Sequence, residues 1–162
     1  MQKITTCLWF DGQAEEAVNF YTSVFKNSRG GGSTRYDDTV AEQAKMPKGS
    51  VMTVSFELEG RKFLALNGGP AFKFNEAISL IVHCETQEEI DYYWEKLTSG
   101  GGEESVCGWL KDKFGLSWQI FPTMLEEVMG GGNPEGIKRW MTALMQMRKL
   151  DIKALKDAYE GK

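Results

Sequence analysis

His83, the only histidine in the chain, is the side chain with the clearest potential for chemistry. Imidazole titrates near neutral pH without perturbation, so His83 is a candidate general base. Its position near the end of a predicted strand is more typical of a hydrogen-bonded structural histidine. Cys7 and Cys107 are nucleophile candidates by residue type alone. Neither has an identifiable base and positive neighbour, so both are expected to be structural thiols.

Charge and composition exclude several classes of function. The net charge is −4 over 162 residues, without the basic cluster that nucleic-acid binding requires. Three widely spaced cysteines without a C-x-x-C motif indicate reduced thiols. Met1–Phe10 is too short and too polar for a signal peptide, and no apolar run approaches the ~20 residues of a membrane span. We therefore expect a cytoplasmic protein without nucleic-acid or membrane partners.

Two successive parts of the chain show the same order of predicted elements. In the first part, a β-rich run at Ile4–Phe10 precedes a helical pattern at Gln13–Phe25 and a predicted hairpin at 51–66. In the second, a strand at Ile78–Cys84 precedes a helix at Gln87–Leu97, followed by further short strands. The apolar faces of the two helices coincide when the parts are aligned. This order indicates a duplicated strand–helix–strands module.

The segments outside these patterns differ in character. Thr39–Ser50 is polar and contains proline and glycine, so it is interpreted as a mobile loop. Pro122–Met129 is expected to be a short helix. Asn133 is a candidate N-cap with Pro134 at the first helical position, and Asp151 is a candidate cap for a last helix.

Four local motifs lie in a fixed order along the chain. They are LWFDGQAEEA at Leu8–Ala17, LNGGP at Leu66–Pro70, CGWLKD at Cys107–Asp112 and GLSWQI at Gly115–Ile120. Together with the duplicated module, they resemble the PhnB-like branch of the vicinal-oxygen-chelate (glyoxalase/bleomycin resistance/dioxygenase) superfamily. Many members of this branch carry the label 3-demethylubiquinone-9 3-methyltransferase. The resemblance covers about residues 4–122.

The resemblance implies an α+β fold with two β-α-β-β-β modules that form a curved sheet around a cleft, plus C-terminal helices. The glyoxalase-like domain would span residues 1–122, with modules at about 1–70 and 71–122, and residues 123–162 would form a helical extension. Because single-module barrels of this superfamily usually share or swap their halves, the resemblance also implies a homodimer.

Metal enzymes of this superfamily bind the ion with side chains from the first and last strands of each module. The resemblance places these positions at Thr5, Leu64, Ser79 and Gln119. Leucine has no donor atom, and unsupported hydroxyls and one amide are poor ligands. We therefore expect no metal and no cofactor. The glycine run after Arg29 follows a helix rather than a first strand, unlike the cofactor turn of a Rossmann-type methyltransferase.

We expect the cleft to bind a planar or amphipathic small molecule, as the resistance proteins of this fold do. The residues predicted to contact the ligand are Thr5, Cys7, Trp9, Leu64, Leu66, Asn67, Ser79, Ile81, Ser117, Gln119 and Phe121. Sequestration would need no catalytic group. The alternative is an enzyme of the same superfamily, with His83 as the base, performing quinone-related methyl transfer or lyase, isomerase or dioxygenase chemistry. A third hypothesis is an interaction module that uses the helical tail.

Several of these side chains also have ordinary structural interpretations. Trp9 is either a pocket wall or part of the core, whereas Trp118 is expected in the core. Trp109 lies on a short exposed segment and suits a pocket rim or a dimer contact. Gln119, with Ser117 beside it, would orient a ligand or hold one water molecule. Asn67 fits the turn before two glycines at least as well as a ligand contact.

Overall fold

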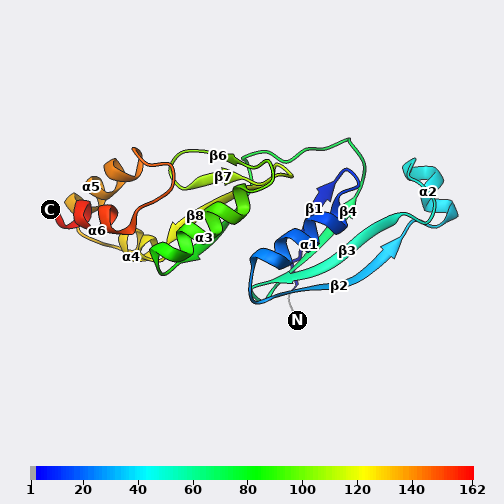
Figure 1. Cartoon of the computed structure of the whole chain (residues 1–162), viewed down its shortest axis with the longest axis horizontal. Helices are drawn as coiled ribbons and strands as arrows, with labels where there is room; N and C mark the ends of the chain where they lie inside the picture. The colour runs from blue at the N-terminus through cyan, green and yellow to red at the C-terminus, as the bar shows by residue number, and fades with distance from the viewer. Residues whose placement is uncertain (1–2) are drawn as a thin grey trace. The chain divides into compact units, whose positions relative to one another are not determined.

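The order β-α-β-β-β occurs in both halves of the chain, and the first half adds one short helix between its second and third strands (Figure 1). The computed structural model describes residues 3–162, and a first unit ends at Phe74 where a second begins at Asn75. Within the described residues, each unit contains one four-stranded sheet. The predicted α+β fold with a duplicated module is confirmed.

The first unit is a sheet covered by one helix. Its elements are β1 (Thr6–Phe10), α1 (Ala14–Val24), β2 (Ser28–Arg35), β3 (Val51–Leu58) and β4 (Arg61–Asn67), and the strand order is β1-β4-β3-β2. Strands β1 and β4 are parallel, and the other pairs are antiparallel. Alternation buries Leu8 and Phe10 in the core and leaves Cys7 and Trp9 on the opposite face.

The segment predicted to be a loop between β2 and β3 contains a short helix, α2 (Asp38–Ala44). The loop prediction for Thr39–Ser50 was therefore wrong for the first part of that segment. The Asp37 side chain caps the helix by accepting a hydrogen bond from the Val40 amide, and Ala41 anchors it in a buried position. The polar composition concealed this local capping signal.

The second unit repeats the sheet and adds a helical tail. Its elements are β5 (Ser79–Cys84), α3 (Gln87–Thr98), β6 (Glu103–Glu104), β7 (Trp109–Lys111), β8 (Ser117–Pro122), α4 (Met124–Met129), α5 (Pro134–Leu144) and α6 (Ile152–Glu160), with strand order β5-β8-β7-β6. Asn133 and Asp151 cap α5 and α6 as predicted. Among residues 3–162, no helix has the length and apolar character to cross a membrane.

The tail is attached to the module through the segment between α5 and α6. Leu150 in this segment is fully buried. The Gln87 side chain on α3 donates to the Leu150 carbonyl at 3.0 Å and accepts from the Ile152 amide at 2.9 Å. The Cys107 and Gly108 amides donate to two further carbonyls of the segment. The tail therefore fixes the loop that precedes β7.

Candidate ligand-binding site

Strand register gathers several predicted site residues on one face of the second sheet. Ser117 on β8 lies opposite Ser79 on β5 and Lys111 on β7. In the next row, Gln119 lies between Ile81 and Trp109. The intervening positions Leu110, Trp118 and Ile120 are buried on the side where α3 packs. Trp118 therefore belongs to the core, as predicted.

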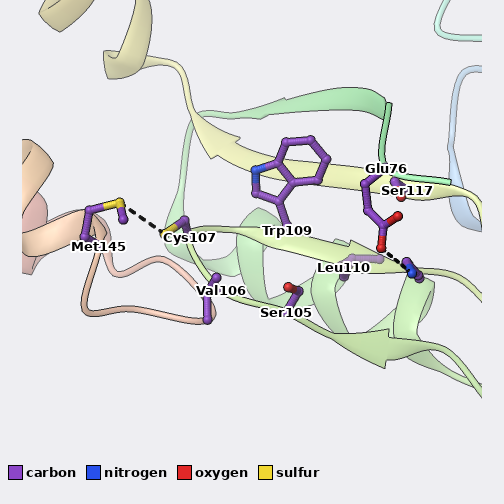
Figure 2. A pocket seen from close by; sticks show the side chains of 9 residues that line it. Glu76, Ser105, Val106, Cys107, Trp109, Leu110, Ser117 and Met145 are labelled. Atoms are coloured by element: carbon purple, nitrogen blue, oxygen red, sulfur yellow. Dashed lines mark hydrogen bonds and ion pairs between the residues drawn. The ribbon is translucent and has the colours of Figure 1, made fainter. Parts of the chain in front are cut away.

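This face borders a pocket of about 450 Å³ at the loop before β7 (Figure 2). Its lining residues come from the turn before β5, from the loop and strand of β7, from β8 and from the tail: Glu76, Ser105, Val106, Cys107, Trp109, Leu110, Lys111, Ser117 and Met145. Most of the lining is apolar, and the Trp109 indole is half-buried. A mainly apolar wall with a few polar groups is the usual composition of a small-molecule site.

An ion pair marks one end of the pocket. The ammonium group of Lys111 lies 2.5 Å from a carboxylate oxygen of Glu76, and both residues line the pocket (Figure 2). The hydrogen bond to Lys111 lowers the pKa of the Glu76 carboxyl, and the same bond raises the pKa of the Lys111 ammonium group. Both groups are therefore charged at neutral pH.

Two hydroxyl groups at the sheet have different environments. The Gln119 side-chain amide donates to the Ser79 hydroxyl at 2.8 Å, so these two groups satisfy each other. Ser117 is fully buried at the floor of the pocket, and its hydroxyl has no hydrogen-bond partner among the described residues. Buried polar groups rarely remain unpaired, so the Ser117 hydroxyl is a potential contact for a ligand or a water molecule.

Sulfur atoms lie at the opposite end of the pocket. The Cys107 thiol lies 3.6 Å from the Met145 sulfur, as the dashed line in Figure 2 marks. Cys107 adopts a left-handed backbone conformation, with a φ of 56°, and its amide donates to the Met147 carbonyl at 2.7 Å. A side chain of the tail thus completes the wall of a pocket on the sheet.

The predicted residues of the first unit share a face of their own sheet. Cys7 lies opposite Leu64, and Trp9 lies opposite Leu66. The Trp9 indole nitrogen donates to the Gly69 carbonyl at 2.8 Å, and its ring meets Phe72 edge-on at 4.9 Å. Thr5 precedes β1 and is exposed.

Asn67 has a structural role that its sequence context only partly indicated. Its side-chain oxygen accepts a hydrogen bond from the Ala14 amide at 2.9 Å, and its side-chain nitrogen donates to the Val51 carbonyl at 3.1 Å. The residue is buried, so its amide joins the start of α1 to β3. Both hydrogen-bonding ends of the amide are occupied, and we leave Asn67 out of the candidate site.

His83 lies near the end of β5 and outside the pocket. Its Nδ1 atom is 3.9 Å from a carboxylate oxygen of Glu126 on α4, and both side chains are exposed. Phe121, its neighbour on β8, is buried. The histidine therefore has an acidic neighbour, and it does not line the pocket beside Trp109.

The positions that the resemblance assigns to metal ligands do not fit a metal ion. Leu64 has no donor atom, and the Gln119 side-chain nitrogen donates a hydrogen bond to the Ser79 hydroxyl, so two of the assigned positions already contact each other. Among the side chains that the structure describes, no three from His, Cys, Asp or Glu lie close enough to hold an ion. An aliphatic side chain and hydroxyls without further support are poor ligands for a cation.

Sequence reasoning missed several residues that line the pocket. Lys111 lies two residues after Trp109 on β7 and therefore on the same face of the strand. The pairing of β7 with β8 would have placed it beside Ser117. Glu76 lies in a connector without periodicity, and Met145 follows α5, far along the chain. No local signal in the sequence joins these two residues to the sheet.

The thiols of Cys7 and Cys84 should differ sharply in reactivity. Cys84 is fully buried, and burial raises the pKa of its thiol to about 12. Cys7 is exposed, although partial desolvation also raises its pKa. Since the thiolate is the reactive form, we expect 5,5′-dithiobis(2-nitrobenzoic acid) to modify Cys7 in the native protein and Cys84 only after unfolding. Equal native rates in single-cysteine variants would contradict this order.

The raised pKa of Cys84 also predicts a loss of stability at alkaline pH. The unfolded thiol loses its proton near pH 9 and the folded thiol near pH 12, so the folded state binds more protons between these values. The free energy of unfolding should therefore fall as the pH rises from about 9 towards 12. Urea unfolding of the wild type and of Cys84→Ala at pH 8 and pH 10.5 measures this, and the variant should show the smaller fall.

Comparisons with known proteins place this arrangement in a family. The sequence matches the model of the family described as 3-demethylubiquinone-9 3-methyltransferase over residues 2–121. Among solved structures, the chain is similar to the PhnB protein from Bacillus cereus at 40% identity and a TM-score of 0.66, covering 75% of this chain and 100% of that one. No curated protein matches the chain.

Two more distant structures share the fold alone. Protein PA1353 from Pseudomonas aeruginosa is 17% identical, with a TM-score of 0.59, over 75% of this chain and 98% of that one. The fosfomycin resistance protein FosX from Mesorhizobium loti is 12% identical, with a TM-score of 0.56, over 81% of this chain and 100% of that one. The chain belongs to the 3-demethylubiquinone-9 3-methyltransferase family, the PhnB-like proteins of the vicinal-oxygen-chelate superfamily.

Proposed function

We propose that this protein binds a small organic molecule, without a metal ion, in the pocket beside Trp109. The pocket of about 450 Å³ carries this proposal, because its volume and its mainly apolar lining are those of a small-molecule site. The aromatic ring of Trp109 offers a flat surface, and the Lys111–Glu76 pair offers polarity at one end. Holding a ligand in this way needs no catalytic group.

Trp109→Ala should weaken binding of the neutral probe N-phenyl-1-naphthylamine by about 10-fold or more, because an aromatic anchor supplies much of the affinity of such a site. Fluorescence titration of the probe measures the dissociation constant. The matched control is Tyr92→Ala, which removes a half-buried ring on α3 outside the pocket and should leave the constant within about twofold. Equal losses in both variants would contradict the proposal.

Native mass spectrometry of protein purified without a chelator tests the remaining parts of the proposal. We expect a homodimer, either empty or carrying an organic mass. A stoichiometric metal mass would contradict the assignment of a metal-free site. A monomer at micromolar concentration would contradict the proposed homodimer. Ligand binding would still be tested by the fluorescence titration. The reduced state of the cysteines supports a cytoplasmic location.

An enzymatic role for His83 is the second candidate. The observation in its favour is the approach of Glu126 to Nδ1 at 3.9 Å, since a carboxylate beside Nδ1 can orient an imidazole for proton transfer. Both groups are exposed and the pocket lies elsewhere, which favours the binding function. If the protein turns over a substrate through this base, His83→Ala should reduce kcat by about 100-fold or more.

A further inference from the structure

We propose that the ligand of the pocket is an amphipathic aromatic anion, and that Glu76 occupies the site of its anionic group in the free protein. This inference rests on the proposed binding function and names the chemical class of the ligand. The anionic group would bind the Lys111 ammonium group, and the aromatic body would lie against Trp109 and the apolar lining beyond it.

The ion pair shows which charge the pocket selects. Among the described residues that line the pocket, Lys111 is the only cation, and its strand position fixes the stem of its side chain on the pocket face of the sheet. Glu76 lies in a turn outside the strands, and its side chain is 62% exposed, against 34% for Lys111. The cation is therefore the fixed member of the pair, and the carboxylate is the movable member.

Exchange of Glu76 for a ligand carboxylate or sulfonate is energetically reasonable. A solvent-exposed ion pair contributes little net stability, so moving Glu76 away from Lys111 costs little. A ligand anion restores the same contact and adds the burial of its aromatic body, which the short Glu76 side chain cannot supply. Glu76 would return to water, where its charge is well solvated.

The unpaired hydroxyl of Ser117 supports an anion at this end of the pocket. Ser117 is the cross-strand neighbour of Lys111, and its buried hydroxyl is a hydrogen-bond donor without a partner among the described residues. A carboxylate or sulfonate has several acceptor oxygens and can accept from a hydroxyl and an ammonium group together. At the other end, Val106 and Met145 offer only apolar or weakly polar surface.

A matched pair of probes tests this inference. 8-Anilinonaphthalene-1-sulfonate and N-phenyl-1-naphthylamine share one ring system and differ by the sulfonate. Glu76→Gln should tighten binding of the sulfonate probe about threefold, because the amide competes less well for Lys111. Lys111→Met should weaken it about 10-fold. The neutral probe should change less than about twofold in both variants.

Lys149→Met is the control, because it removes a lysine whose ion pair with Asp91 lies outside the pocket. It should leave both probes unchanged. A partly unfolded Glu76→Gln variant would expose apolar surface and bind both probes more tightly. A gain for the sulfonate probe alone therefore cannot arise from misfolding, and the inference stays testable if Lys111→Met does not fold. The anion inference is wrong if the neutral probe binds but neither substitution changes the affinity of the sulfonate probe. It is also wrong if Glu76→Gln lowers that affinity. In both cases the proposed binding function stands. If neither probe binds the wild type, both proposals are wrong.

Discussion

Replacing Asp112 by alanine should lower the free energy of unfolding by about 3 kcal/mol, because three hydrogen-bond donors lose a charged acceptor. Its side chain is buried and accepts from the Phe114 amide at 2.9 Å, the Leu116 amide at 3.1 Å and the Trp118 indole at 2.8 Å. These contacts shape the turn between β7 and β8 and fix the core tryptophan. Urea unfolding at neutral pH measures the change.

Asp112→Asn is the informative companion to the alanine variant. An amide keeps one carbonyl oxygen for the two backbone donors but presents its NH₂ group to the Trp118 indole, so about half of the loss should remain. A loss below about 1 kcal/mol in the alanine variant would show that desolvation of the carboxylate nearly cancels its hydrogen bonds. In that case the turn would owe its shape to the backbone rather than to Asp112.

The second large effect is expected for Leu150→Ala. The leucine is fully buried, and truncating such a residue leaves a cavity that typically costs about 2–5 kcal/mol. Two of its side-chain atoms lie 3.0 and 3.2 Å from where a Cβ at Gly108 would stand, so it packs directly on the loop before β7. Thermal and urea unfolding should both show the loss.

This substitution should also affect the pocket, although Leu150 does not line it. Carbonyl groups in the segment between α5 and α6 accept hydrogen bonds from the Cys107 and Gly108 amides. Met145, which lines the pocket, lies at the start of this segment. We therefore expect binding of N-phenyl-1-naphthylamine to weaken together with stability. Met141→Ala, an exposed position on α5, should change neither quantity by much. A lower free energy of unfolding with an unchanged dissociation constant for the probe would show that the tail and the pocket wall are energetically independent.

The sequence predicted the sheet modules well because their signals are local. Alternation identified the strands, and the capping residues Asn133 and Asp151 identified the starts of α5 and α6. Alternation also placed Gln119 and Ser79 on one face, where they form a hydrogen bond. Helical periodicity did not identify α2, because a seven-residue helix with one buried alanine has too few apolar positions to show a period.

The pocket itself could not be predicted, because it depends on contacts between distant segments. Glu76 reaches Lys111 from a connector, and Met145 reaches Cys107 from the tail. Neither pair has a sequence pattern, because each contact depends on how the loops pack rather than on strand or helix period. Asn67 illustrates the same limit: its neighbouring glycines suggested a turn, but its amide holds α1 and β3 together.

The origin of Met145 has a consequence for how this family diversifies. The family match ends at residue 121, whereas this methionine, which closes one end of the pocket, follows α5 in the tail. A gene that keeps every strand of the sheet but acquires a different sequence after β8 would therefore encode a differently shaped pocket. Selection for a new ligand could act on the tail while the module that defines the family stays unchanged.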